Sequence, residues 1–397
     1  MVTLIKKCRL CRGKLKIILS FRLPLVNSFP KVNEIKSEKE YPLKFAVCFD
    51  CQLLQLATII NPEELFRQYD YLTGASVPLV RHIKKLAQYC EEKYDLKVGA
   101  RILDIGCNDG TLLKNFLEKG FSVLGVEPVR NIAKIAVEAG IPVIKGYFDS
   151  TLAGKILKKE GDFNLIFSTH SLANVLDINS FIKGAKLLLS PAGTLVIEVA
   201  DSEEMLKNSQ FDSIYHEHYS YFTRRTLKLL LERNGFTVMQ IRKVATQGGS
   251  VQVFARGNLA TSDVDFKKSI KDQLLIEKFT QTVEEYRRAV RVLFEKIKEK
   301  KVFAFGAPAK GVTFLNYCGL NFKNIVFAVD STPFKVGKYI PGTQIRVFEE
   351  SCLGKARVDY CLLLSWNYQK GILRKIEKLG KKIKVIIPFP KLRILKD

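Results

Sequence analysis

No run of apolar residues in this sequence is long enough to cross a membrane. A membrane-spanning helix needs about 18 consecutive apolar residues, and no stretch of the 397 residues approaches that length. The first 20 residues carry six lysines and arginines where a signal peptide would have its apolar segment. We therefore expect a cytoplasmic protein that neither spans a membrane nor is secreted.

Internal repeats, low-complexity tracts and arginine-rich tails are also absent. The composition, 47% hydrophobic and 26% charged, excludes a disordered chain and is typical of two or three domains with sizeable cores. Acidic residues are few, and the net charge is +24. Nucleic acid, an anionic surface or a phosphate-bearing substrate would suit this charge, but the lysines are scattered, which favours a solvated basic surface.

Cysteine occurs at nine positions, an odd number that argues against a disulfide-stabilised protein of this length. Four of them form two C-x-x-C pairs, Cys8 with Cys11 and Cys48 with Cys51. Two such pairs supply the four thiolates of a structural zinc site, with no open position for a catalytic water. A redox C-x-x-C motif and coincidence are the alternatives. The 36 residues between the pairs should hold structure of their own.

From residue 101 onward, apolar runs alternate with helix-like segments, which is typical of a parallel, doubly wound α/β sheet. A helix near 223–234 and strands near 236–242 and 250–256 indicate an antiparallel hairpin at the sheet edge. The apolar runs of the sheet lie at 102–103, 122–126, 143–144, 165–167 and 194–199.

A charged helical pattern over 263–301 and renewed alternation from 302 indicate a connecting helix and a second, smaller doubly wound domain. The predicted segments are a zinc-binding domain over 1–68, a larger α/β domain over 69–258, a connecting helix over 259–301 and a Rossmann-like domain over 302–397.

A glycine-bearing turn follows the first strand of the larger domain. Gly106 and Gly110 stand in the sequence L-D-I-G-C-N-D-G-T, and the acidic Glu127 ends the next strand, where a carboxylate can bind both hydroxyls of a ribose. The G-x-G-x-x-G pattern of nicotinamide-binding proteins is missing, and the acidic Asp104 precedes the turn. A zwitterionic adenosyl ligand therefore fits better than a pyrophosphate. A turn whose glycines serve packing alone is the alternative.

This turn, with the strand-end glutamate and the terminal hairpin, resembles the S-adenosylmethionine site of class I methyltransferases. The resemblance implies a seven-stranded sheet, S-adenosylmethionine as cofactor and a set of cofactor-binding residues. These are Asp104, Gly106, Asn108, Gly110, Glu127, Phe148, Ser168 and His170.

The segment 214–222, I-Y-H-E-H-Y-S-Y-F, holds two of the four histidines and precedes the predicted helix at 223. A base, a carboxylate and a phenol together suit removal of a proton beside a carbonyl. A packed aromatic loop with hydrogen-bonded histidines is the alternative.

In this position Y-H-E-H-x-S-Y-F is similar to the signature of nucleotide-sugar C-methyltransferases, which act in dTDP-deoxysugar pathways. The resemblance covers nearly the whole chain, from the cysteine pairs to F-G-A-P-A-K-G at 305–311 and S-W-N at 365–367. It implies methylation of a nucleoside-diphosphate 4-keto sugar beside its ketone. His218 would be the base, Tyr215 would donate to the enolate oxygen, and Glu217 would orient His218 or hold a sugar hydroxyl.

Four further residues are expected to contact the substrate. Tyr69 or Tyr71 would cover the site, and Lys310 would bind diphosphate at a helix N-terminus, with a purely structural turn as the alternative. Asn174 stands where the family commonly has an assisting histidine, and asparagine cannot shuttle a proton. His170 is the candidate replacement.

Two other functions remain open at this stage. A methyltransferase of RNA or another macromolecule would suit the charge and predicts salt-sensitive nucleic-acid binding, but no N-P-P-Y tetrapeptide is present. A non-catalytic nucleotide-sugar binder would explain Asn174 but not the retained Tyr215, Glu217 and His218. We expect a monomer or homodimer that binds a nucleotide sugar rather than nucleic acid.

Overall fold

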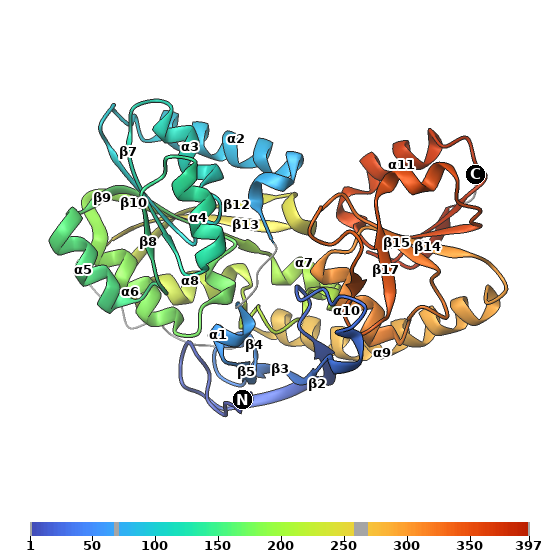
Figure 1. Ribbon diagram of the computed structural model, residues 1–397. Coiled ribbons are helices and arrows are strands. Elements are labelled where there is room, and N and C mark those ends of the chain that lie inside the picture. Colours follow the sequence, from blue (N-terminus) through green and yellow to red (C-terminus); the bar gives the residue numbers. More distant parts are fainter. Residues whose placement is uncertain (1, 67–70, 258–268, 396–397) are drawn as a thin grey trace.

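The computed structural model describes residues 2–66, 71–257 and 269–395. Two seven-stranded sheets lie on the left and right of Figure 1, and the N-terminal strands lie below them. Within the described ranges, no helix combines the length and the apolar character needed to cross a membrane.

The first large sheet has the strand order β12-β13-β10-β9-β6-β7-β8. Its five strands from β10 to β8 are parallel, and β12 and β13 add an antiparallel hairpin at one edge. This is the class I methyltransferase fold, as predicted. The strands are β6 (Arg101–Ile105), β7 (Ser122–Glu127), β8 (Val143–Lys145), β9 (Phe163–Thr169), β10 (Leu189–Ala200), β12 (Phe236–Val244) and β13 (Ser250–Gly257).

Helices cover both faces of this sheet. Leu103 and Ile105 of β6 join one apolar cluster, whereas Ile102 joins the cluster on the opposite face. This two-sided burial explains the nearly continuous apolar runs of the strands. One face is covered by α2 (Val77–Lys93), α3 (Thr111–Leu117) and α4 (Arg130–Glu138), and the other by α5 (Ser150–Glu160), α6 (Ile178–Leu188) and α8 (Arg224–Arg233).

The N-terminal residues form a four-stranded sheet of order β11-β4-β3-β2. The strands β2 (Leu15–Pro24) and β3 (Glu40–Cys48) form a hairpin that fills the interval between the two cysteine pairs, as expected. The other strands are β4 (Leu54–Leu56) and β11 (Ser220–Tyr221). Because β11 belongs to the segment 214–222, the predicted zinc domain and the predicted catalytic loop share one sheet. Beside it, β1 (Val2–Leu4) pairs with β5 (Thr58–Ile60), followed by α1 (Pro62–Leu65).

A long helix, α9 (Ile270–Lys296), lies within the predicted connecting segment. Its buried side chains, among them Phe279, Val283 and Val290, pack in the largest apolar cluster, which extends from the N-terminal hairpin into the C-terminal sheet. The short helix α7 (Ser202–Lys207) contacts α9.

The second large sheet has the order β16-β17-β15-β14-β18-β19-β20, with five parallel strands between antiparallel edges. It confirms a second α/β domain. Its elements are β14 (Val302–Phe305), α10 (Ala309–Cys318), β15 (Phe327–Val329), β16 (Tyr339–Ile340), β17 (Ile345–Phe348), β18 (Tyr360–Leu363), α11 (Gln369–Glu377), β19 (Lys384–Ile387) and β20 (Arg393–Leu395).

Candidate active site and metal centre

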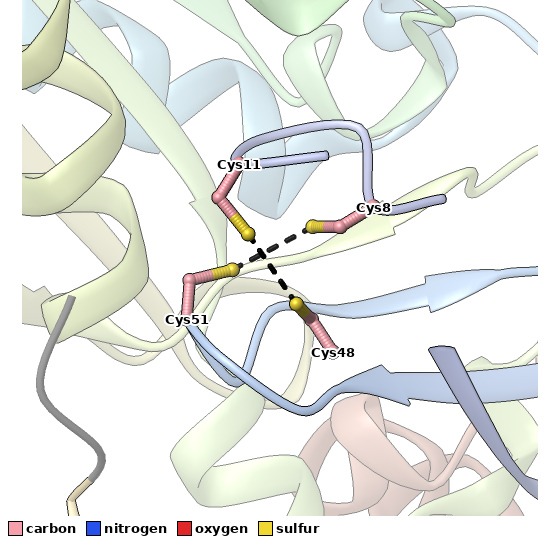
Figure 2. Close-up of side chains that lie close together, drawn as sticks. All are labelled: Cys8, Cys11, Cys48 and Cys51. Carbon is pink, nitrogen blue, oxygen red and sulfur yellow. Dashed lines mark hydrogen bonds between the residues drawn. The ribbon is translucent and has the colours of Figure 1, made fainter. Parts of the chain in front are cut away.

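The two C-x-x-C pairs come together in space (Figure 2). The sulfur atoms of Cys8 and Cys51 are 3.5 Å apart, those of Cys11 and Cys48 are 3.4 Å apart, and all four lie within 4.8 Å of one another. A zinc ion with zinc–sulfur bonds of about 2.3 Å would hold its sulfurs about 3.8 Å apart. The cluster therefore fits a four-thiolate zinc site.

Hydrogen-bond donors point at two of these sulfurs. Nε2 of Gln55 lies 3.1 Å from Sγ of Cys8, and the backbone N–H of Asp50 lies 3.4 Å from Sγ of Cys48. Such donors stabilise thiolates, the form that binds metal. Since all four ligands come from the protein, the site has a structural character.

The zinc-binding segment also contacts the loop 214–222. Nη1 of Arg9, between Cys8 and Cys11 in sequence, donates to the carbonyl oxygens of Leu56 at 2.7 Å and Tyr219 at 3.1 Å. In addition, β11 pairs with β4. The loop is thus held by the N-terminal sheet.

A cavity of about 400 Å³ opens at the carboxyl ends of β6, β7 and β9. At its turn Gly106 has φ +80°, and a Cβ there would lie 2.5 Å from Cβ of Ser171, so only glycine fits. Eight of the predicted residues line this cavity: Tyr71, Asp104, Gly106, Asn108, Glu127, Phe148, His170 and Asn174.

Two buried carboxyl groups make this cavity suitable for a cationic ligand. Glu127 accepts hydrogen bonds from the backbone N–H groups of Asn108 at 3.0 Å and Val129 at 2.9 Å, which fix its orientation. Burial raises the pKa of Asp104 to about 8, with Glu127 adding to the effect. Oδ1 of Asp104 is buried and has no hydrogen-bond partner among the described residues. A cation bound beside Asp104 favours its ionised form, which accepts hydrogen bonds. The ammonium, sulfonium and ribose groups of S-adenosylmethionine suit the ionised carboxylates, so the residues present fit this cofactor.

The segment 71–74, called the strap below, is hydrogen-bonded to the glycine-bearing turn 106–110. Asn108 accepts from the backbone N–H of Thr73 at 2.9 Å and donates to the carbonyl oxygen of Tyr71 at 3.2 Å. Oδ2 of Asp109 accepts from the backbone N–H of Gly74 at 2.7 Å. Tyr71 therefore reaches the cavity. Tyr69, the other candidate for this position, lies outside the described residues.

Two predicted cofactor residues do not line the cavity. Gly110 has φ +78° and begins α3, and a Cβ there would meet the side chain of Ile141 at 2.8 Å. The hydroxyls of Ser168 and Ser171 are 2.8 Å apart, and Ser171 donates to the carbonyl oxygen of Ile105. Gly110 and Ser168 therefore contribute to the packing and hydrogen bonding of the turn and not to the cavity lining.

His218 forms a hydrogen-bonded pair with Tyr215. Oη of Tyr215 lies 2.9 Å from Nε2 of His218, and the carbonyl oxygen of Ser213 lies 3.3 Å from Nδ1. A carbonyl only accepts, so Nδ1 carries the hydrogen and Nε2 accepts from the tyrosine. Burial, with Lys310 nearby, lowers the pKa of His218 to about 3, which keeps the ring neutral.

Lys310 reaches this loop from the C-terminal domain. Its Nζ donates to the carbonyl oxygen of Gln247 at 2.7 Å and lies 5.2 Å from the ring of Trp366. Burial lowers the pKa of Lys310. Lys310 and His218 both line a second, small cavity of about 20 Å³ between the domains. Lys310, the second residue of α10, thus contacts the turn Thr246–Gly248 between β12 and β13.

Glu217 faces away from His218, toward the N-terminal segment. Both carboxylate oxygens accept from Nδ2 of Asn27, at 2.7 and 2.8 Å. Burial raises the pKa of Glu217 to about 7. The group that faces Nδ1 of His218 is the carbonyl of Ser213.

Glu198 and His82, two residues beside the cavity, were not predicted from the sequence. Glu198 of β10, which is 1% exposed, contacts Nε2 of both His82 and His170. A single acidic residue within the apolar run 194–199 was the available signal, since an acid in a buried strand needs partners.

Family models match three consecutive parts of the chain. They are described as "Putative zinc binding domain" for residues 8–66, "Methyltransferase domain" for residues 75–241 and "C-methyltransferase C-terminal domain" for residues 245–390. The C-methyltransferase NovU of Streptomyces niveus is 32% identical over 409 residues, which cover 98% of this chain and 97% of that protein. This chain belongs to the C-methyltransferase family.

Two further proteins match a smaller share of this C-methyltransferase. The ubiquinone biosynthesis O-methyltransferase of Bartonella bacilliformis is 31% identical over 143 residues, covering 34% of this chain and 56% of that protein. The magnesium protoporphyrin IX methyltransferase of Synechocystis, solved with bound S-adenosylmethionine, aligns with 45% of this chain and 79% of its own, at 14% identity and a TM-score of 0.35. The family model for the methyltransferase domain and the fold identify this C-methyltransferase as dependent on S-adenosylmethionine. The family model for the N-terminal residues and the four-cysteine cluster identify a structural zinc site.

Proposed function

We propose that this protein methylates a nucleoside-diphosphate 4-keto-deoxysugar at a carbon next to its ketone. The observation that carries the proposal is the partly buried contact of 2.9 Å between Oη of Tyr215 and Nε2 of His218, in the loop held by the N-terminal sheet. A neutral imidazole and a phenol at this distance are the acceptor and the donor that enolisation of a ketone needs.

The proposed reaction begins at these two side chains. When the ketone binds, the hydroxyl of Tyr215 turns from His218 to the ketone oxygen, which frees Nε2 to accept the proton. The carbon–hydrogen bond breaks, its electron pair forms the enolate, and Tyr215 donates to the enolate oxygen. When bound, S-adenosylmethionine supplies the methyl group as an electrophile. The proton on His218 is then released to solvent, so that one proton is produced per methyl group transferred.

Three other residues support a nucleotide-sugar substrate. Lys310 brings a cation to the same small cavity as His218, which suits a diphosphate. Oδ1 of Asn174 is buried without a hydrogen-bond partner in the described chain and belongs to a residue that lines the large cavity, so it can accept from a sugar hydroxyl. Tyr71 lies over the same cavity.

A pair of histidine variants tests the proposal. His218→Ala should lower methyl transfer by about 100-fold or more and leave S-adenosylmethionine affinity nearly unchanged. His216→Ala is the matched control, because His216 lies two residues away and faces the carbonyl of Pro42 instead. Equal turnover of His218→Ala and the wild type would remove His218 from the mechanism, and transfer to RNA but to no nucleotide sugar would refute the substrate.

A further inference from the structure

A buried carboxylate in β10 holds two histidines. The oxygens of Glu198 lie 2.8 Å from Nε2 of His82 and 3.0 Å from Nε2 of His170. Thr246 and Gln252 donate to the same carboxylate at 3.0 and 2.7 Å. Burial favours the protonated acid, but the hydrogen bonds from both histidines hold the pKa of Glu198 well below its usual range. Glu198 is therefore ionised at neutral pH.

The ionised carboxylate fixes the proton on His170. A carboxylate only accepts hydrogen bonds, so Nε2 of His170 carries a hydrogen, and in the neutral form of the ring the lone pair is on Nδ1. Within the described ranges Nδ1 has no hydrogen-bond partner, and His170 lines the large cavity. An imidazole bound in this way accepts a proton readily, because the carboxylate stabilises the imidazolium that forms.

The backbone of His170 is also held in place for this role. Its φ of 56° lies in the left-handed region, which is uncommon for residues other than glycine. The backbone N–H donates to the carbonyl oxygen of Glu198 at 2.7 Å. Glu198 thus fixes both the main chain and the ring of His170.

His170 lines the large cavity, and His218 lines the small one. The turn Leu172–Asn174 lies between the cavities, with Asn174 lining the large one and Ala173 the small one. When His170 holds a proton, its charge adds to burial and to the charge of Lys310 in lowering the pKa of His218. The two rings therefore lie close enough for their charges to interact.

We propose that His170 is a second proton acceptor of this site, oriented by Glu198, and that it removes a hydrogen from the carbon on the other side of the substrate ketone. This inference rests on the proposed function, since a 4-ketone acidifies the hydrogens on both neighbouring carbons. The carbon–hydrogen bond breaks, its electron pair forms the second enolate, and the proton binds Nδ1 of His170. The hydrogen on Nδ1 exchanges with solvent, and a proton then returns from Nδ1 to the carbon, which re-forms the bond and frees His170. The predicted further activity is hydrogen exchange at the carbon that is not methylated.

The test is proton NMR of the nucleoside-diphosphate 4-keto sugar that the enzyme methylates, incubated in deuterated water with the full-length enzyme and S-adenosylhomocysteine, which prevents transfer. The wild type should exchange hydrogen at both carbons next to the ketone. His170→Asn should slow exchange at the carbon that is not methylated by about 100-fold, and His218→Ala should slow exchange at the other carbon.

Two positioning variants separate this role from a structural one. His82→Asn removes the second imidazole on the same carboxylate without changing the cavity lining, so exchange at both carbons should persist. Glu198→Gln should slow only the exchange that depends on His170. In the nitrogen-15 NMR spectrum of the imidazoles, it should also move hydrogen from Nε2 to Nδ1 of His170.

Exchange at only one carbon in the wild type would overturn the inference. Equal decreases of the exchange rate at the carbon that is not methylated in His82→Asn and His170→Asn would also overturn it. Methyl transfer without the second exchange would refute this inference alone. Absence of both transfer and exchange with every 4-keto sugar would instead refute the proposed function.

Discussion

Arg9 of the zinc-binding segment donates a hydrogen bond of 3.1 Å to the carbonyl oxygen of Tyr219, 210 residues later in the chain. The guanidinium also lies 5.6 Å from the centre of the Tyr219 ring and is almost fully buried. Tyr219 follows His218 directly. The zinc site is therefore linked through one side chain to the loop that carries the proposed base.

Replacement of Arg9 should impair the loop more than the cofactor site. Arg9→Ala removes hydrogen bonds from a charged donor, each of which contributes about 1.5–3 kcal/mol. We expect a fall in kcat of about tenfold or more, while the affinity for S-adenosylmethionine, measured by calorimetry, changes little. Lys6→Ala is the control, because it removes a nearby exposed charge. Equal effects of the two substitutions would contradict this positioning role.

Zinc removal should loosen two segments at once. Elemental analysis should find about one zinc per chain, and Cys8→Ser should lose it, because metal binding and folding of such modules are coupled. Hydrogen–deuterium exchange should then rise both in residues 40–56 and in the loop 214–222, since β4 pairs with β11. An increase confined to the N-terminal strands would show that the loop does not depend on the metal.

The strap over the glycine-bearing turn should contribute to cofactor affinity. Asn108→Gly keeps the backbone freedom required by its φ of 52° but removes the hydrogen bonds to Tyr71 and Thr73. We expect the Kd for S-adenosylmethionine to rise about tenfold, in line with two lost hydrogen bonds. Asn115→Ala is the control, because among the described residues this side chain donates only to carbonyl oxygens of its own helix. An unchanged Kd for Asn108→Gly would exclude the strap from binding.

Glu217 should make stability depend on pH. Burial raises the pKa of Glu217 from 4.5 to about 7, so the folded protein keeps this carboxyl protonated up to a higher pH than the unfolded chain does. The contribution of protonated Glu217 to the free energy of unfolding is fully present below pH 4.5 and is lost as the pH rises toward 7. This loss lowers the free energy of unfolding by about 3 kcal/mol at most. Thermal unfolding should show Glu217→Gln gaining stability relative to the wild type between pH 5 and pH 8. A constant difference over this range would contradict the assignment.

The sequence was sufficient to predict those features that depend on residue types at short, regular spacings. The spacing of Cys8, Cys11, Cys48 and Cys51 predicted the metal cluster, and alternating apolar runs predicted the main sheet and its edge hairpin. The turn at Gly106 and the acid Glu127 were found because glycine at positive φ and a strand-end carboxylate leave a clear pattern. The domain boundaries and the roles of the site residues stay predictions.

Long-range pairings could not be read in this way. The two residues of β11 pair with β4 through the backbone, which leaves no side-chain signal. The partner of Glu217 is Asn27, a polar residue in a turn with no distinguishing neighbours. Likewise, His82 looks like a surface residue of an amphipathic helix until the fold brings it to Glu198.

The most direct measurement is carbon NMR of the product formed from S-adenosylmethionine labelled with carbon-13 in its methyl group and a panel of nucleoside-diphosphate 4-keto-6-deoxyhexoses. The account predicts, with at least one sugar, a labelled methyl group bonded to a carbon next to the ketone and absent from the His218→Ala reaction. A labelled methyl on oxygen or nitrogen, or none on any sugar while S-adenosylmethionine still binds, would contradict it.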